Sequence, residues 1–409
     1  MGPVRPVSLV MIPAIAVIAV MIVIAVIAGC FIYKGSDQLG RNEYNNWQEQ
    51  YEHRYKRFQN MPQPMVSSVQ TEIDLYPSQN RYSIRGDYTI INRTSGPIDS
   101  MLLRLDKGIS WDTVAIGAAL MLSDDREFGH RWYRFPKPLA PGDSQHVHFA
   151  FRYEPSSFRG FGRFNNVLTN GAFLRISNFF PHVGYNEDQE ISNPAERSRR
   201  GMQISTAVPE LKQPLNGTKQ IAQDDDSGQL HQPHDYGFID LQTTISTDAG
   251  QTVVAVGNLE KTWTKNNRNY FHFKTDQPIP FRFALSSAKY HVKSLKQGGT
   301  TIHVYHHPAH ARNINHMLQQ AAASLAYFEK HFCPYPYPTA NFAEISSFTD
   351  GFAATAYPGT FFVNERFGFT HRFDGDTAII KDRDIINEQV GHELSHTWWG
   401  NATFVLLAL

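Results

Sequence analysis

The residues best suited to chemistry lie near the carboxyl end of the chain, where His392, Glu393 and His396 form the sequence H-E-x-x-H. On an α-helix, residues four apart lie on one face, so both imidazoles can reach a single Zn²⁺ at about 2.0–2.1 Å. Glu393 is rotated by about 100° from His392 around the helix axis. Its carboxylate can therefore act as a general base on a zinc-activated water without binding the metal. This spacing predicts Zn²⁺ as a cofactor and hydrolysis of a peptide bond.

A helix must position these side chains. The sequence predicts one from about Asp384 through His396, with Asp384 as its N-cap. Val390 and Leu394 would form the buried face of this helix. Residues 397–401, TWWGN, follow directly. The apolar face and the aromatic residues after it favour a buried catalytic helix over a chance match on a surface helix.

The longer stretch HELSHTWWGN resembles the H-E-x-x-H-x-W-x-G-N signature of the membrane alanyl aminopeptidase family, which belongs to the gluzincin metallopeptidases. The resemblance implies an N-terminal β domain, a thermolysin-like zinc peptidase domain and a peptide substrate. Two stretches between Arg41 and Gly201 look like bacterial proteins in which such a peptidase domain follows the membrane helices of an ABC-type permease. These stretches are QYEHRYKRFQNMPQP and NFFPHVGYNEDQEISNPAER. A permease component is therefore an expected partner.

The chain departs from the family pattern in two ways, and the first concerns the metal. Family members place a third zinc ligand, a Glu, about nineteen residues after the second histidine. This gives the three protein ligands that are usual at a catalytic zinc. That position would lie beyond Leu409. The tyrosine that stabilises the oxyanion in family members would lie further still. We therefore expect a C-terminally truncated chain that binds zinc weakly and hydrolyses little.

The second departure concerns substrate binding. Family members carry a G-x-M-E-N segment whose Glu binds the amino terminus of the peptide, and residues 353–359 match it best. The Glu position falls on Ala356, and Glu344 or Asp350 are the carboxylates that could replace it. The peptidase class is thus better supported than the aminopeptidase label, and exopeptidase or endopeptidase action stays open. The expected substrate-binding residues are Ala354, Ala356, Tyr357, Pro358 and Gly359.

The preceding chain changes from strands to helices. Val69–Leu75, Tyr82–Ile90 and His146–Phe151 alternate apolar and polar residues, which is typical of strands with one buried face. Ala309–Phe332 instead has the 3.6-residue period of a helix. We expect an α+β multidomain protein with a large antiparallel β domain over 65–295 and a partial thermolysin-like zinc peptidase domain over 296–409.

The amino-terminal part predicts a membrane anchor. Val7–Tyr33 contains 27 residues without a charge, and a membrane-spanning helix needs about 20. A lipoprotein signal ending at Cys30 is the alternative, although Phe31–Tyr33 continue the apolar run past that cysteine. We expect a single-pass anchor in a bacterial inner membrane. The side of the membrane that holds the folded domain stays open because few basic residues flank the span.

An amphipathic helical linker is expected over 34–64. Aromatic residues recur there at spacings of three and four, which predicts a helix that packs this stripe on the next domain. They are Tyr44, Trp47, Tyr51, Tyr55 and Phe58.

Composition narrows the remaining possibilities. Lys+Arg and Asp+Glu are equal at 38 each, which gives no electrostatic reason to expect a nucleic-acid partner.

A group of histidines straddles the expected strand-to-helix change, and no carboxylate or cysteine has ligand spacing with them, so we expect no metal there. The alternative to an enzyme is a non-catalytic membrane protein that binds peptides or supports a permease. The histidines are His303, His306, His307, His310 and His316.

Overall fold

The computed structural model describes Met21 and residues 41–154, 165–203, 237–348, 353–370 and 384–401. In these residues no helix is long and apolar enough to cross a bilayer. The expected span 7–33 lies outside the described residues except for Met21. Asp350, one of the carboxylates considered for substrate binding, also lies outside them.

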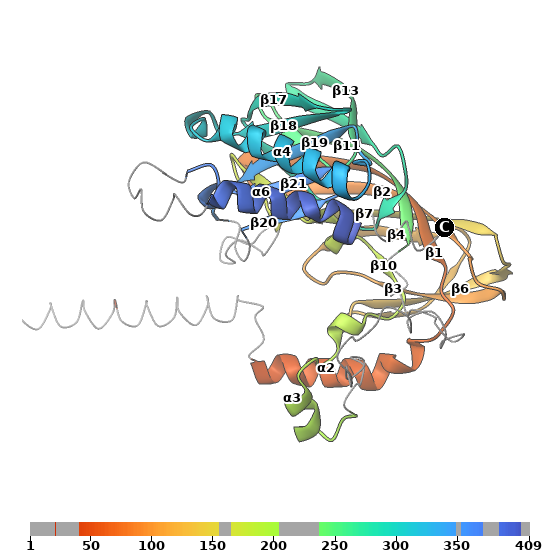
Figure 1. Cartoon of the computed structure of the whole chain (residues 1–409). Helices are drawn as coiled ribbons and strands as arrows, with labels where there is room; N and C mark the ends of the chain where they lie inside the picture. The colour runs from red at the N-terminus through yellow and green to blue at the C-terminus, as the bar shows by residue number, and fades with distance from the viewer. Residues whose placement is uncertain are drawn as a thin grey trace, which may run out of the picture.

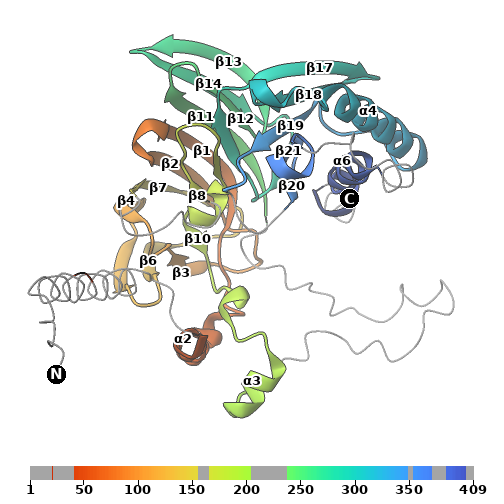
Figure 2. The same ribbon diagram turned by 90° about the vertical axis from the view of Figure 1, so that its left-hand side faces the viewer.

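The expected linker helix is present as α2 (Arg41–Tyr55), which continues as a 3₁₀ turn over Lys56–Phe58. Its aromatic stripe packs on the β domain, as the spacing predicted. The Tyr51 ring stacks on Tyr185 with 5.1 Å between ring centroids, and the Tyr55 ring stacks on His130 at 4.4 Å. Figures 1 and 2 show α2 at the end of the molecule away from α4 and α6.

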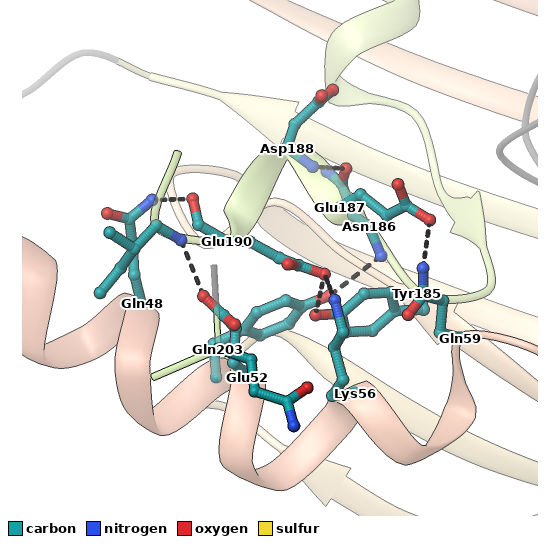
Figure 3. A network of polar contacts seen from close by, with 12 residues as sticks. Gln48, Glu52, Lys56, Gln59, Tyr185, Asn186, Glu187, Asp188, Glu190 and Gln203 are labelled. Atoms are coloured by element: carbon teal, nitrogen blue, oxygen red, sulfur yellow. Dashed lines mark hydrogen bonds and ion pairs between the residues drawn. The ribbon is translucent and has the colours of Figure 1, made fainter. Parts of the chain in front are cut away.

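Polar contacts reinforce this packing (Figure 3). Gln48 donates to the carbonyl oxygen of Glu190 at 2.8 Å, and the Lys56 ammonium lies 2.6 Å from the Glu190 carboxylate. Glu52 accepts hydrogen bonds from Arg197 at 2.8 and 2.9 Å, and both side chains are buried. Arg197 belongs to the short helix α3 (Pro194–Arg199). Helix α2 is therefore fixed to the β domain by both aromatic and ionic contacts.

The β domain is built around one large sheet with the order β13-β14-β11-β1-β2-β7-β4, in which β15 also pairs with β11. Most neighbours are antiparallel, as expected, but β1 and β11 are parallel. This corrects the prediction of a large antiparallel domain at one strand pair, and the long connection between the two strands allows the required crossover. The strands are β1 (Met65–Tyr76), β2 (Arg81–Ile91), β4 (Ser110–Ile116), β7 (Ser144–Tyr153), β11 (Phe238–Asp248), β13 (Asn258–Lys265), β14 (Arg268–Lys274) and β15 (Ile279–Pro280).

Two smaller sheets complete this domain, with the orders β10-β3-β6-β5 and β12-β16-β9-β8. Their inward side chains and those of the large sheet form one apolar core. The strands are β3 (Ile98–Arg104), β5 (Leu120–Asp125), β6 (His130–Leu139), β8 (Asn165–Asn166), β9 (Ala172–Leu174), β10 (His182–Val183), β12 (Thr252–Ala255) and β16 (Leu285–Ala288). Short 3₁₀ turns cover Pro77–Gln79, Ile176–Phe179 and Glu187–Gln189.

The alternation predicted for β2 is present, with Tyr82, Ile84, Tyr88 and Ile90 buried. Gly86 lies at the centre of this buried face. A Cβ atom there would lie 2.2 Å from the Phe149 ring. The glycine is therefore required because the aromatic ring of the neighbouring strand fills its space.

The second region is a mixed sheet with the order β17-β18-β19-β21-β20, and helices α4 and α6 pack together against it (Figure 1). Helix α4 begins later than the expected residue 309 because Pro308–His310 forms a 3₁₀ turn. The elements are β17 (His291–Gln297), β18 (Thr300–His306), α4 (Ile314–His331), β19 (Thr339–Ile345), β20 (Ala354–Tyr357), β21 (Thr360–Asn364), a 3₁₀ turn over Glu365–Phe367 and α6 (Ile385–Ser395).

Candidate active site

Helix α6 carries the H-E-x-x-H motif, and its position is set by a cap and an apolar face. The Asp384 carboxylate accepts a hydrogen bond from the Asn387 backbone N–H at 3.0 Å, which caps the first turn. Ile386, Val390 and Leu394 are buried in one cluster with residues of α4 and the sheet. This packing fixes the rotation of the helix and therefore the direction of the motif side chains.

The chain after α6 is anchored as well. Residues Thr397–Asn401 form a π-helical turn. Trp398 is buried, and its indole N–H donates to the carbonyl oxygen of Cys333 at 3.0 Å. The TWWGN sequence thus holds the carboxyl end of the motif against the loop that follows α4.

The two histidines point toward each other. The Nε2 atoms of His392 and His396 lie 3.2 Å apart. Two nitrogen ligands at about 2.05 Å from a tetrahedral zinc are about 3.3 Å apart, so this separation fits a shared ion. Burial lowers the pKa of His396, and the nearby His392 lowers it further. Both effects favour the neutral imidazole that a metal requires.

Glu393 lies on the buried side of the same turn and is only 5% exposed. Burial raises the pKa of its carboxyl to about 7, while the positive charge of Arg282 acts in the opposite direction. Its Oε2 atom is buried and has no hydrogen-bond partner in the described part of the chain. A carboxyl with this pKa can both accept and release a proton near neutral pH.

The donor set fits a zinc ion. The ligand atoms of His392, Glu393 and His396 all lie within 4.8 Å of one another. The two imidazoles would hold the ion, and the Oε2 atom of Glu393 would accept a hydrogen bond from a water beside it. The structure therefore brings together the three residues that the sequence motif predicted, in an arrangement that zinc can occupy.

The expected substrate segment lies beside the motif. Residues Ala354–Tyr357 form β20, the last strand in the sheet order, and α6 contacts this strand (Figures 1 and 2). Pro358 and Gly359 form the turn into β21, and Gly359 has a φ of 65°. Ala356 is 3% exposed and belongs to the same apolar cluster as Val390 and Leu394. The position expected to bind an amino terminus is thus occupied by a methyl group inside the core.

Glu344 does not replace the missing carboxylate at β20. It accepts a hydrogen bond from the His307 backbone N–H at 2.7 Å and another from the His310 ring. These residues line a separate cavity of about 290 Å³, together with Glu365. The sequence reasoning missed this grouping because it tested only ligand spacing along the chain, whereas β19 and the turn after β21 bring the two carboxylates to His310.

The other histidines of the group have separate partners. His303 Nδ1 lies 2.7 Å from the Ser294 hydroxyl, and His316 Nε2 lies 2.7 Å from the Asp384 carboxylate. His303 and His316 lie apart from His310, whereas the His307 and His310 rings lie 5.1 Å apart and His310 also groups with Glu344 and Glu365. The expectation that these histidines do not converge is therefore wrong for His307 and His310.

The sequence reasoning also missed Arg282, which follows β15. Its guanidinium lies over the Tyr357 ring at 4.9 Å from the centroid, and Nη2 lies 3.4 Å from the Thr355 hydroxyl. The charge of Arg282 lowers the pKa of both Glu393 and His396. Arg282 therefore joins the β domain to β20, its charge acts on the motif residues, and no local sequence signal marks it.

The fold is similar to that of the M1 zinc metallopeptidase from Deinococcus radiodurans, with a TM-score of 0.52 and 13% identity over 85% of this chain and 68% of that one. A mutant M1 zinc metallopeptidase from the same organism gives a TM-score of 0.51 and 12% identity, over 83% of this chain and 65% of that one. The chain thus spans about two thirds of the length of these structures. At this identity the similarity shows the fold. No protein-family model matches the chain.

The comparison supports the predicted fold at a coarse level. The described residues form a sheet-rich α+β protein whose fold is shared with zinc metallopeptidases.

Proposed function

We propose that this protein is a zinc-dependent peptidase. The observation that carries the proposal is the pair of Nε2 atoms 3.2 Å apart on α6, with the buried carboxyl of Glu393 beside them. The shared fold with M1 zinc metallopeptidases supports it. The cofactor would be Zn²⁺, held by His392 and His396, and the partner would be a peptide.

Glu393 would perform the proton transfers. When bound, zinc would polarise the peptide carbonyl and lower the pKa of a water. The Glu393 carboxylate takes one proton from the water whose oxygen attacks the carbonyl carbon. As the C–N bond breaks, the protonated carboxyl gives this proton to the leaving nitrogen. A pKa of about 7 suits both steps near neutral pH.

Ala354, Tyr357, Pro358 and Gly359 would border the substrate cleft, since β20 lies at the edge of the sheet next to α6. The outer backbone edge of such a strand can hydrogen-bond an extended peptide. Ala356 would contribute packing rather than a charge. The proposal therefore names a peptidase and leaves out the amino-terminal recognition that defines an aminopeptidase.

We also propose that Val7–Tyr33 anchors the protein in a membrane in a single pass, since 27 uncharged residues exceed the length that a bilayer requires. A permease component would be a partner of the anchored protein. Membrane fractionation tests the anchor. Retention of the chain in the membrane after alkaline carbonate washing would support it, and release by this wash would contradict it.

The peptidase proposal is tested by zinc titration and by hydrolysis of a quenched-fluorescence peptide library. His392→Ala should weaken zinc binding at least tenfold, because one of two imidazole ligands is lost. Glu393→Gln should keep zinc affinity within a few-fold and should lower any hydrolysis by about 10²–10⁴-fold. Ser395→Ala on the same helix is the matched control and should change neither quantity.

Three outcomes would count against the proposal. Unchanged zinc affinity in His392→Ala would show that the ligands are wrongly assigned. Undiminished hydrolysis in Glu393→Gln would show that this carboxyl is not the base. Because this chain is expected to hydrolyse little, the comparison is with Glu393→Gln: peptide binding with no hydrolysis above that of Glu393→Gln at saturating zinc would favour the alternative of a non-catalytic peptide-binding protein.

A further inference from the structure

A cavity of about 400 Å³ lies between the β domain and the end of β20. Its walls carry three arginines from separate parts of the chain. Arg104 ends β3, Arg175 follows β9 and Arg282 follows β15, and Tyr357, the last residue of β20, also lines the cavity. A cavity with several guanidinium groups is suited to an anion, because each group offers donors in a planar fork.

Arg175 and Arg282 line the same cavity and lie close enough for their charges to interact. Burial lowers the pKa of Arg175, and the nearby positive charge of Arg282 lowers it further. Two like charges at such a distance destabilise each other. An anion between them would remove this cost and gain charge-assisted hydrogen bonds.

The contacts of Arg282 leave its donors available. It is exposed, its hydrogen bond to Thr355 is long, at 3.4 Å, and its other side-chain hydrogen bond goes to Tyr357, which lines the same cavity. The Nε atom of Arg104 is buried and has no hydrogen-bond partner in the described ranges. Asp106 lies near Arg104. Burial raises the pKa of Asp106, and the positive charge of Arg104 opposes this rise. The Asp106 carboxylate therefore offsets part of the charge of Arg104. Arg282 is therefore the arginine best placed to bind a ligand.

Two carboxylates also line the cavity, and they lie on its outer side. Glu187 and Asp188 are both exposed. Glu187 accepts a hydrogen bond from Gln59 at 2.7 Å, which directs it toward the turn after α2 (Figure 3). Water screens exposed charges strongly. Arg282 is screened in the same way, but Arg104 and Arg175 are half-buried and are screened less, so the more buried part of the cavity keeps an excess of positive charge.

This cavity adjoins the proposed catalytic residues. Tyr357 is the last residue of β20, and α6, which carries the motif, contacts this strand. We propose that the cavity lined by Arg104, Arg175, Arg282 and Tyr357 binds a carboxylate of the peptide substrate close to the scissile bond. This inference rests on the proposed peptidase function and specifies its substrate class. Together with Ala356, it replaces recognition of a positive amino terminus by recognition of a negative group.

The carboxylate could belong to the carboxyl terminus of the peptide or to an acidic side chain. Binding is measured by calorimetry on the full 409-residue chain, first with zinc and then after zinc removal by a chelator. One pair of probes is trialanine with a free carboxylate and trialanine amide. The other pair is Ala-Glu-Ala amide and Ala-Gln-Ala amide. Each pair differs by one carboxylate, so it isolates one source of the negative charge.

We expect one pair to show at least a tenfold preference for the carboxylate, because a hydrogen bond to a charged group corresponds to about 10–100-fold in affinity. Arg282→Met should abolish this preference, and Arg282→Lys should keep part of it. The matched control is Arg85→Met on β2, an exposed arginine that does not line the cavity. It should leave the preference unchanged.

Equal affinity within both pairs would overturn the inference, as would an unchanged preference in Arg282→Met. Failure of the peptidase proposal has a different signature. A carboxylate preference that depends on Arg282 and persists without zinc, in a chain that hydrolyses no peptide, would support the cavity and refute the catalytic assignment.

Discussion

Arg197, below α2, and Arg282, beside the zinc motif, carry the same charged group in opposite surroundings. Arg197 is buried and makes two hydrogen bonds to the Glu52 carboxylate, at 2.8 and 2.9 Å. It also donates to the carbonyl oxygens of Ile191 and Gln203. Arg282 is exposed, and its side chain makes a long hydrogen bond to Thr355 and another to the Tyr357 hydroxyl, with no carboxylate partner among the ion pairs of the described residues.

The difference separates two uses of an arginine. A buried guanidinium must be paired with a carboxylate, because an uncompensated charge in the interior is costly. The pair of Arg197 and Glu52 can thus fix the position of α2, whereas the donors of Arg282 remain available to a ligand. Replacement by methionine should therefore lower the free energy of unfolding strongly at Arg197 and very little at Arg282.

The largest effect is expected from Arg197→Met. This change leaves the Glu52 carboxylate buried with the Ile191 N–H as its remaining donor, which should lower the free energy of unfolding by about 3–5 kcal/mol. Urea denaturation followed by tryptophan fluorescence measures it, since Trp47 and Trp132 lie in the affected region. The double variant Glu52→Gln with Arg197→Met should recover part of the loss. A loss below about 1 kcal/mol in the single variant would contradict the structural role.

The same interface predicts a pH dependence. Burial lowers the pKa of His130 to about 4, Arg104 adds to this lowering, and the bond to the Phe128 carbonyl opposes it. Between about pH 6.5 and 4, the unfolded chain binds a proton that the folded chain excludes. This contribution to stability is therefore complete above about pH 6.5 and falls by up to about 3 kcal/mol as the pH approaches 4.

His130→Gln tests this prediction, since its unfolding free energy should vary less between pH 6.5 and 4 than that of the wild type. His53→Gln is the matched control, because the His53 side chain on α2 is 72% exposed. Identical pH profiles for wild type and His130→Gln would show that other groups cause the acid sensitivity.

Local patterns allowed much of this architecture to be predicted. The i, i+4 spacing of His392 and His396 requires only a helix, and the apolar residues of α6 supply it. Alternation likewise located β2 and β7, whose inward side chains form the core. The parallel pairing of β1 with β11 could not be predicted, because it depends on partners far apart in the chain.

The same limit applies to the candidate site. The motif residues are neighbours in sequence, so their grouping was visible there. Arg175, Arg282 and Tyr357 meet only because β9, β15 and β20 end at one cavity. The sequence shows that Ala356 departs from the family pattern. The structure adds that its side chain is buried in one apolar cluster with Val390 and Leu394.

The smallest effect on stability is expected from Arg282→Met, and it completes the comparison with Arg197→Met. The substitution removes the cation–π contact with Tyr357, which contributes about 0.5–1 kcal/mol at an exposed site. It also removes the repulsion from Arg175. The two changes oppose each other, so the free energy of unfolding should stay within about 0.5 kcal/mol of the wild type.

The same urea titration, repeated with the preferred carboxylate peptide at a hundred times its Kd, distinguishes a ligand-binding arginine from a structural one. The peptide should stabilise the wild type by about 2.7 kcal/mol, because it binds the folded chain alone. It should stabilise Arg282→Met far less at the same peptide concentration, because the weakened affinity lowers the occupancy. A loss of more than about 2 kcal/mol without peptide would instead place Arg282 in the same structural class as Arg197, since only a side chain that the fold depends on produces such a loss.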